Sequence, residues 1–132
     1  MDWTLEVVVV PVADLERAVL FYTEQVGFVL DFDTSTPKMR LVQLTTPGSA
    51  CSISLGTVRP SGAEVGAEPG SIRGLQLVVS DIEAARAELV GRGVDVTSVQ
   101  RIDPRDGGAF MHFRDPDGNE WTIQEIRARA GV

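Results

Sequence analysis

The chain has 132 residues, a formal net charge of −7 at pH 7 and one cysteine. The length predicts a single domain over 1–132, and the acidic balance disfavours nucleic acid and anionic membranes, which are bound by basic surfaces. One cysteine excludes an internal disulfide, and without a basic leader or an apolar run of bilayer length we expect a cytoplasmic protein with no membrane partner.

The first half of the chain begins with an apolar strand over 5–12 and continues with a helix. Asp14 is a good N-cap, and apolar residues then recur at helical spacing from Leu15 to Val26. Gly27 can end the helix in the left-handed conformation. Three strand-like runs follow, at 28–33, 39–45 and 51–56.

The second half repeats this order of elements. A strand over 72–79 leads to Asp81, which lies 67 residues after Asp14, and the next helix ends at Gly91 or Gly93. Three strand-like runs again follow, at 94–100, 109–114 and 120–125. A segment rich in Gly, Pro and Glu at 57–71 is typical of a surface linker between the halves.

The repeated order predicts an α+β fold of two tandem βαβββ modules, at 4–56 and 72–126. In such a module a helix covers one face of a small sheet and leaves the other face open. We therefore expect the two modules to form an eight-stranded incomplete barrel around one cleft, and a ligand to bind in that cleft.

Two strings, DLERAVLFYTEQVGF at 14–28 and FRDPDGNEWTI at 113–123, match known motifs. They resemble those of the vicinal oxygen chelate superfamily, which includes glyoxalase I, extradiol dioxygenases and bleomycin-resistance proteins. Residues 14–28 are DLERAVLFYTEQVGF, similar to the family's D-L-x-x-A-x-x-F-Y-x-x-x-L-G-F. Residues 113–123 are FRDPDGNEWTI, similar to F-x-D-P-D-G-N-x-x-E-L. The resemblance implies the glyoxalase/bleomycin resistance fold over about residues 4 to 126.

The resemblance also implies where a metal would bind. The family's metalloenzymes place ligands on the first and fourth strands of each module, at positions that match Val7 and Ser54 in the first and Gly74 and Thr122 in the second. A divalent metal needs about three N, O or S donors in fixed geometry. We therefore expect no metal and no other cofactor.

Strand alternation, in the register that the resemblance implies, predicts which side chains face the cleft. The apolar and small members would form its wall, and the glutamine amides would orient a ligand. The ligand-binding candidates are Val7, Val9, Ser54, Gly74, Gln76, Phe110, His112, Thr122 and Gln124.

Two residues are candidates for catalysis. Histidine as a residue type has an unperturbed pKa of about 6.5, which suits acid–base work, so His112 is one candidate. Glu120 could act as a base or pair with a cationic ligand. The structural alternatives are a histidine that only bonds a neighbour such as Glu120, and a glutamate in water at the rim.

The resemblance is closest to the drug-binding members, because the predicted cleft is apolar with a few polar groups. We expect a metal-free protein that binds a small hydrophobic or aromatic molecule and acts in sequestration, antibiotic resistance or delivery. The alternatives are a metal-independent isomerase, cyclase or lyase that uses His112 and Glu120, and a metal-dependent lyase or dioxygenase. Family members usually pair, so a homodimer is expected.

Overall fold

The computed structural model describes residues 1–59 and 61–129. Within it the chain divides into two compact units. The first unit comprises residues 1–72 together with 115–119, and the second comprises 73–114 together with the chain from 120 onward. The units thus follow the two predicted halves, except that a short turn of the second half belongs to the first unit.

The first unit contains a four-stranded mixed sheet in the order β1-β4-β3-β2. Strand β1 (Val7–Val10) pairs in parallel with β4 (Ser52–Leu55). Strands β3 (Arg40–Thr45) and β2 (Val29–Ser35) continue the sheet in antiparallel fashion. Between Leu30 and Phe32 the register shifts at a bulge in β2.

The helix of the first unit begins as predicted but is not a regular α-helix throughout. Asp14 caps α1 (Leu15–Leu20) by accepting a 3.1 Å hydrogen bond from the backbone N–H of Arg17, and Gly27 ends the segment with a φ of 95°. From Phe21 to Val26 the chain forms a π-helix, η1. The wider π turn brings the consecutive Phe21 and Tyr22 into the core together, whereas regular helical spacing predicts only Tyr22 there.

The second unit contains a four-stranded mixed sheet of the same kind, in the order β5-β8-β7-β6. Strand β5 (Leu75–Val79) runs parallel to β8 (Glu120–Glu125), and β7 (Ala109–Arg114) is antiparallel to β8. The edge strand β6 is short, Gln100–Arg101. A single 3-10 turn, η2 (Arg127–Arg129), follows β8.

The predicted strand at 94–100 is wrong over most of its length. Val94 and Val96 are buried and Asp95 is exposed, so the alternation is real. The backbone, however, pairs with β7 only at an isolated bridge between Val96 and Phe113 and then at β6. Alternation reports which side chains are buried and does not by itself show that the backbone forms a ladder.

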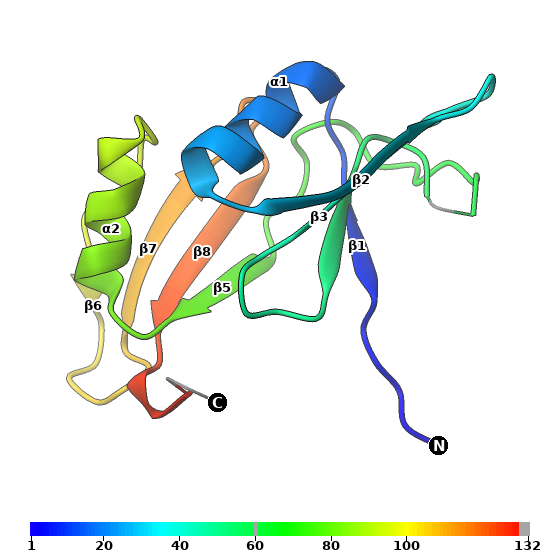
Figure 1. The fold of residues 1–132 in the computed structure, drawn as a ribbon. Helices are drawn as coiled ribbons and strands as arrows, with labels where there is room; N and C mark the ends of the chain where they lie inside the picture. The colour runs from blue at the N-terminus through cyan, green and yellow to red at the C-terminus, as the bar shows by residue number, and fades with distance from the viewer. Residues whose placement is uncertain (60, 130–132) are drawn as a thin grey trace. The chain divides into compact units, whose positions relative to one another are not determined.

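Helix α2 (Ile82–Gly91) has the bounds that the sequence predicts and lies along one face of the β5-β8-β7-β6 sheet (Figure 1). Asp81 caps it through the N–H of Ala84 at 3.0 Å, and the buried carboxylate of Glu125 accepts from the N–H of Ile82 at 2.9 Å. The last strand therefore holds the start of the helix, where backbone N–H groups lack helical partners.

The two units share one register as well as one order of elements. In the first unit Ser54 of β4 pairs with Val9 of β1, and in the second Thr122 of β8 pairs with Gln76 of β5. The predicted α+β fold of tandem four-stranded modules is confirmed. Among residues 1–59 and 61–129, no helix is long and apolar enough to cross a membrane.

The turn at 115–119 is held by a buried hydrogen-bond network within the first unit. Asp115 Oδ1 accepts from the N–H groups of Asp117, Gly118 and Asn119 at 2.9–3.0 Å, and its Oδ2 accepts from Tyr22 Oη at 2.7 Å. The side chain of Asn119 donates to Asp115 Oδ2 and to the carbonyl of Pro11, each at 2.8 Å. These partners explain the D-P-D-G-N string as structural chemistry.

Candidate functional site

The sheet of the second unit has one buried face and one open face. One set of alternating residues on β7 and β8 is buried: Met111, Phe113, Trp121 and Ile123. The alternate residues are half-buried or exposed, and they are Gln76, Val78, Phe110, His112, Glu120, Thr122 and Gln124. The side chains that sequence alternation assigned to the ligand side of β5, β7 and β8 thus lie on the open face.

His112 lies in the middle of the open face with one ring nitrogen bonded and the other available. Its Nδ1 is 3.1 Å from Thr122 Oγ1, and its backbone N–H donates to Thr97 Oγ1 at 2.9 Å. Across residues 1–59 and 61–129 no protein group bonds its Nε2. Two threonines therefore hold the residue while one nitrogen stays free to donate to or accept from a ligand.

A pocket of about 470 Å³ opens beside this histidine. It is lined by Asp95, Thr97, His112, Phe113, Arg114 and Glu120. Glu120 does not bond His112; it accepts from Arg114 Nη2 at 3.2 Å and Nε at 3.3 Å. The pocket size suits a small organic molecule, and its rim carries both signs of charge.

Asp95 and Thr97 were not among the residues that the sequence predicted for the site. They belong to the segment expected to be a regular strand, in which nothing marked them as lining a pocket. These two residues reach the pocket because their segment lies opposite β7, and that position depends on the bridge between Val96 and Phe113. The sequence alone does not indicate this bridge.

The two glutamines of the open face form a chain of hydrogen bonds. Gln76 Nε2 donates to Gln124 Oε1 at 2.7 Å, and Gln124 Nε2 donates to the carbonyl oxygen of Gly107 at 2.7 Å. Both ends of Gln124 are thus used within the protein. Of the two amides, Gln76 is the exposed one.

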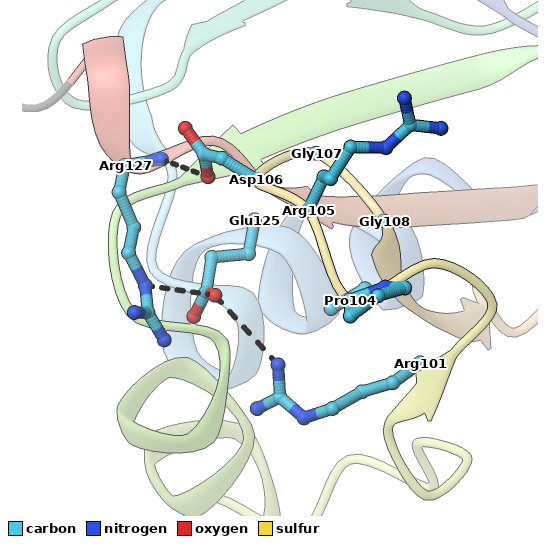
Figure 2. A pocket seen from close by; sticks show the side chains of 9 residues that line it. Arg101, Pro104, Arg105, Asp106, Gly107, Gly108, Glu125 and Arg127 are labelled. Carbon is cyan, nitrogen blue, oxygen red and sulfur yellow. Dashed lines mark hydrogen bonds and ion pairs between the residues drawn. The ribbon is translucent and has the colours of Figure 1, made fainter.

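Gly107 belongs to a loop between β6 and β7 that borders a second, smaller hollow, shown in Figure 2. Arg101 and Arg127 both reach Glu125 there, with Nη1 of Arg101 3.9 Å and Nε of Arg127 3.0 Å from Oε1 (Figure 2). Because Glu125 also caps α2, its carboxylate in this cluster is occupied by structural contacts.

Carboxylates fix the shape of this loop. Two hydrogen bonds from the Arg105 guanidinium hold the pKa of Asp103 below its ordinary value, and the N–H groups of Arg127 and Ala128 do the same for the pKa of Asp106. The distances from Asp106 to these N–H groups are 2.8 and 2.9 Å. The loop is therefore tied at 103–105 to itself and at 106 to the start of η2.

The site residues predicted for the first unit lie on β1 and β4. Val7 and Val9 are half-buried, whereas Ser54 is only 1% exposed. Gly74 directly precedes β5, and a Cβ added to it would meet no atom within 4 Å. There is thus space at Gly74, while Ser54 offers little surface to a ligand.

The positions that the family resemblance assigns to metal ligands do not fit a metal. Valine at 7 and glycine at 74 carry no donor atom, and the hydroxyls of Ser54 and Thr122 are weak ligands for a divalent ion. No group of three or more His, Cys, Asp or Glu side chains within 1–59 and 61–129 is placed to hold a metal. We derive no step through a metal.

The two units share one strand order and one order of elements, and this tandem arrangement defines a single class of fold. The chain belongs to the Glyoxalase/Bleomycin resistance protein/Dioxygenase superfamily, whose family model matches residues 4–123. A search of curated proteins found no match.

Solved structures of the same fold include three relatives with more than 30% identity. TnmS3, an antibiotic binding protein from Streptomyces sp. CB03234, is 34% identical, with a TM-score of 0.78 and coverage of 95% of this chain and 97% of that one. A glyoxalase/bleomycin resistance protein from the same organism is 35% identical, with a TM-score of 0.75 and coverage of 92% and 99%. A superfamily member from Sphaerobacter thermophilus DSM 20745 is 33% identical, with a TM-score of 0.77 and coverage of 94% and 98%.

Proposed function

We propose that the chain binds a small hydrophobic or aromatic molecule without a metal, and that it acts by sequestration or delivery of that molecule, as in antibiotic resistance. The open face of the second unit, centred on Gln76, Phe110 and His112, is the proposed binding surface. Val7 and Val9, on β1, remain ligand-binding candidates within the first unit.

The observation that carries this proposal is the chemistry at the family's ligand positions. Val7, Ser54, Gly74 and Thr122 give no useful donor set for a divalent ion. The open face nevertheless keeps one aromatic side chain, Phe110, and a few polar groups, and small-molecule sites combine apolar and polar groups in this way. Similarity to an antibiotic binding protein over nearly the whole chain supports the same function.

A second candidate function, a metal-independent isomerase, cyclase or lyase, is favoured by His112. His112 lines a pocket, and its Nε2 has no protein partner within residues 1–59 and 61–129, as an acid–base catalyst requires. Glu120, the proposed partner in catalysis, is held by Arg114 instead of by His112, which favours the binding protein.

The experiment that separates these functions uses the His112→Ala variant. Small molecules that copurify with the protein from its native host are identified by mass spectrometry and then incubated with fresh protein. If the protein only binds the molecule, the molecule is recovered unchanged. The His112→Ala substitution then lowers the affinity for it by no more than about tenfold, which is what one hydrogen bond contributes to binding. Conversion of the molecule by the parent, abolished in His112→Ala, would instead establish the enzyme.

We also propose a homodimer, because each four-stranded sheet has two edge strands and because Val29, Leu30 and Phe32 of edge strand β2 are exposed. Sedimentation at micromolar concentration should give about twice the chain mass of 14.2 kDa, and the mass of a single chain would refute it.

A further inference from the structure

The glutamine chain on the open face has a direction that its anchor imposes. The carbonyl oxygen of Gly107 can only accept a hydrogen bond, so the end of the Gln124 amide that faces it, at 2.7 Å, must be Nε2. This leaves Gln124 Oε1 facing Gln76, and an amide oxygen can only accept. The Gln76 group that meets it must therefore be Nε2, at 2.7 Å.

The consequence is that the outer end of the chain presents an oxygen. With Nε2 turned toward Gln124, Gln76 Oε1 has no partner within residues 1–59 and 61–129. Gln76 is an exposed residue, so this oxygen is accessible. An isolated glutamine could rotate its amide and offer either end to a ligand, whereas Gln76 loses one hydrogen bond if it does so.

We propose that the chain Gly107–Gln124–Gln76 makes the binding site selective for molecules that carry a hydrogen-bond donor, such as a phenolic hydroxyl or an N–H group, and that Gln124 is the residue that positions Gln76. This inference rests on the proposed function, since it concerns the ligand of the same open face. It names a chemical class, hydrophobic molecules with a donor, that neither the fold nor the comparisons specify.

The anchor of the chain is held where it is by the loop geometry. Gly107 has a φ of +90°, which side-chain-bearing residues rarely adopt, and a Cβ there would lie 3.5 Å from Gln124 Nε2. A Cβ on Gly108 would come within 2.2 Å of the carbonyl oxygen of Asp103, so the loop closes too tightly for any side chain. Asp106, labelled beside Gly107 in Figure 2, ties the loop to Arg127.

A ligand whose donor binds Gln76 would share the open face with one aromatic side chain, Phe110, and with a second polar group, His112. Gln76, Thr122 and His112 are register partners across β5, β8 and β7. Neighbouring strands are about 4.8 Å apart, so Gln76 and His112 stand about 10 Å from each other. A flat molecule of two or three fused rings spans that distance, with a donor at one end for Gln76 Oε1.

The test uses two probes on the same ring system: 1-naphthol, which carries a hydroxyl donor, and 1-methoxynaphthalene, in which a methyl group replaces the hydroxyl hydrogen. Their dissociation constants are measured by isothermal titration calorimetry for the parent and for Gln76→Met, Gln124→Met and the control Gln100→Met, which changes a glutamine of β6 outside the chain. We expect the parent to prefer 1-naphthol by about 3- to 10-fold, the range of a neutral hydrogen bond. Gln100→Met should keep this preference.

The two variants in the glutamine hydrogen-bond chain, Gln76→Met and Gln124→Met, should behave differently from the control. Gln76→Met removes the acceptor, so its preference for 1-naphthol should disappear. Gln124→Met leaves Gln76 in place but frees its amide to rotate, so the preference should shrink while the affinity for 1-methoxynaphthalene changes little. If Gln124 acted in folding alone, Gln124→Met would weaken the binding of both probes equally and leave the ratio of their dissociation constants unchanged.

The outcomes distinguish this inference from the proposed function. If the parent binds both probes with equal affinity, and Gln76→Met changes neither, the selectivity is refuted while the binding function stands. If the parent binds neither probe, the proposed function fails as well. A preference for 1-naphthol that survives in Gln76→Met would also refute the inference, because another acceptor would then be responsible.

Discussion

At the scale of single residues, the same polar chemistry serves two purposes in this chain. Asp115 is completely satisfied: its two oxygens accept from three backbone N–H groups and two side chains. Gln76 and His112 each keep one polar atom without a protein partner in the described part of the chain. A fully paired buried group stabilises the fold, whereas an exposed unpaired group on a sheet face is available to a ligand.

Removal of the Tyr22 hydroxyl should destabilise the protein without affecting ligand binding. Tyr22 is fully buried, and its Oη donates to the Asp115 carboxylate at 2.7 Å. We expect Tyr22→Phe to lower the free energy of unfolding by about 1.5–3 kcal/mol, as for hydrogen bonds to charged groups, in urea denaturation. The exposed Asp2→Asn serves as a control and should change little. Parent-like stability of Tyr22→Phe would show that the carboxylate finds another donor.

The sequence predicts single residues well where their role depends on near neighbours. Asp14 and Asp81 cap the helices that they were expected to cap, and Gly27 adopts the left-handed conformation. The partner of His112 could not be predicted in this way. A histidine bonded to Glu120 was one expectation, but the register places Thr122 opposite His112, and Glu120 opposite Arg114.

At the scale of elements, the loop between β6 and β7 links the open face to the end of the chain. Its carbonyl at Gly107 anchors the glutamine chain, and its carboxylate at Asp106 binds the first N–H groups of η2. Nothing in the sequence indicates this connection, because Asp106 and Arg127 come together only through the pairing of β7 with β8. The strand alternation that placed Gln76 and Gln124 is local and could be predicted.

The hydrogen bonds that hold the loop between β6 and β7 to η2 should weaken in acid. The pKa of Asp106 is held below its ordinary value of 3.8 by the N–H groups of Arg127 and Ala128. A carboxyl whose pKa is lowered in the folded state stabilises that state. This stability is fully present at a pH above the ordinary pKa, and it is lost as the pH falls through the lowered pKa. Carbon-detected NMR titration should therefore show the Asp106 carboxyl titrating below 3.8. A midpoint at or above that value would contradict this interpretation.

The Asp106 titration can also be followed through the chemical shift of a backbone amide. The amide of Ala128 donates to Asp106 at 2.9 Å, so its chemical shift should follow the Asp106 titration. In the Asp106→Asn variant this pH-dependent shift of the Ala128 amide should be absent.

At the scale of the whole molecule, the tandem organisation is the part most securely predicted from sequence. Two helix caps 67 residues apart, each preceded by a strand and followed by three, are enough to define two equivalent modules. The structure adds that the turn at 115–119 belongs to the first unit, through Tyr22 and Pro11. That contact joins residues about a hundred positions apart in sequence, which no local pattern encodes.

The binding surface is the central claim, and Gly74 offers the most direct access to it. Outside Gly74 and its two chain neighbours, no atom lies within 4 Å of the position that a Cβ would take there. Gly74 is also not among the glycines with positive φ, so a Cβ at this position meets neither a clash nor backbone strain. Strand alternation puts that side chain on the same face as Gln76. Gly91, at the end of α2, shares the open surroundings and the absence of positive φ, and provides a matched control.

The deciding measurement is the affinity of 1-naphthol, by isothermal titration calorimetry, for the parent, Gly74→Trp and Gly91→Trp, with circular dichroism to establish that each is folded. We expect the parent and Gly91→Trp to bind alike, and a folded Gly74→Trp protein to bind at least tenfold more weakly because the indole occupies the ligand's place. Parent-like affinity in folded Gly74→Trp would contradict the account and would place the ligand somewhere other than the open face.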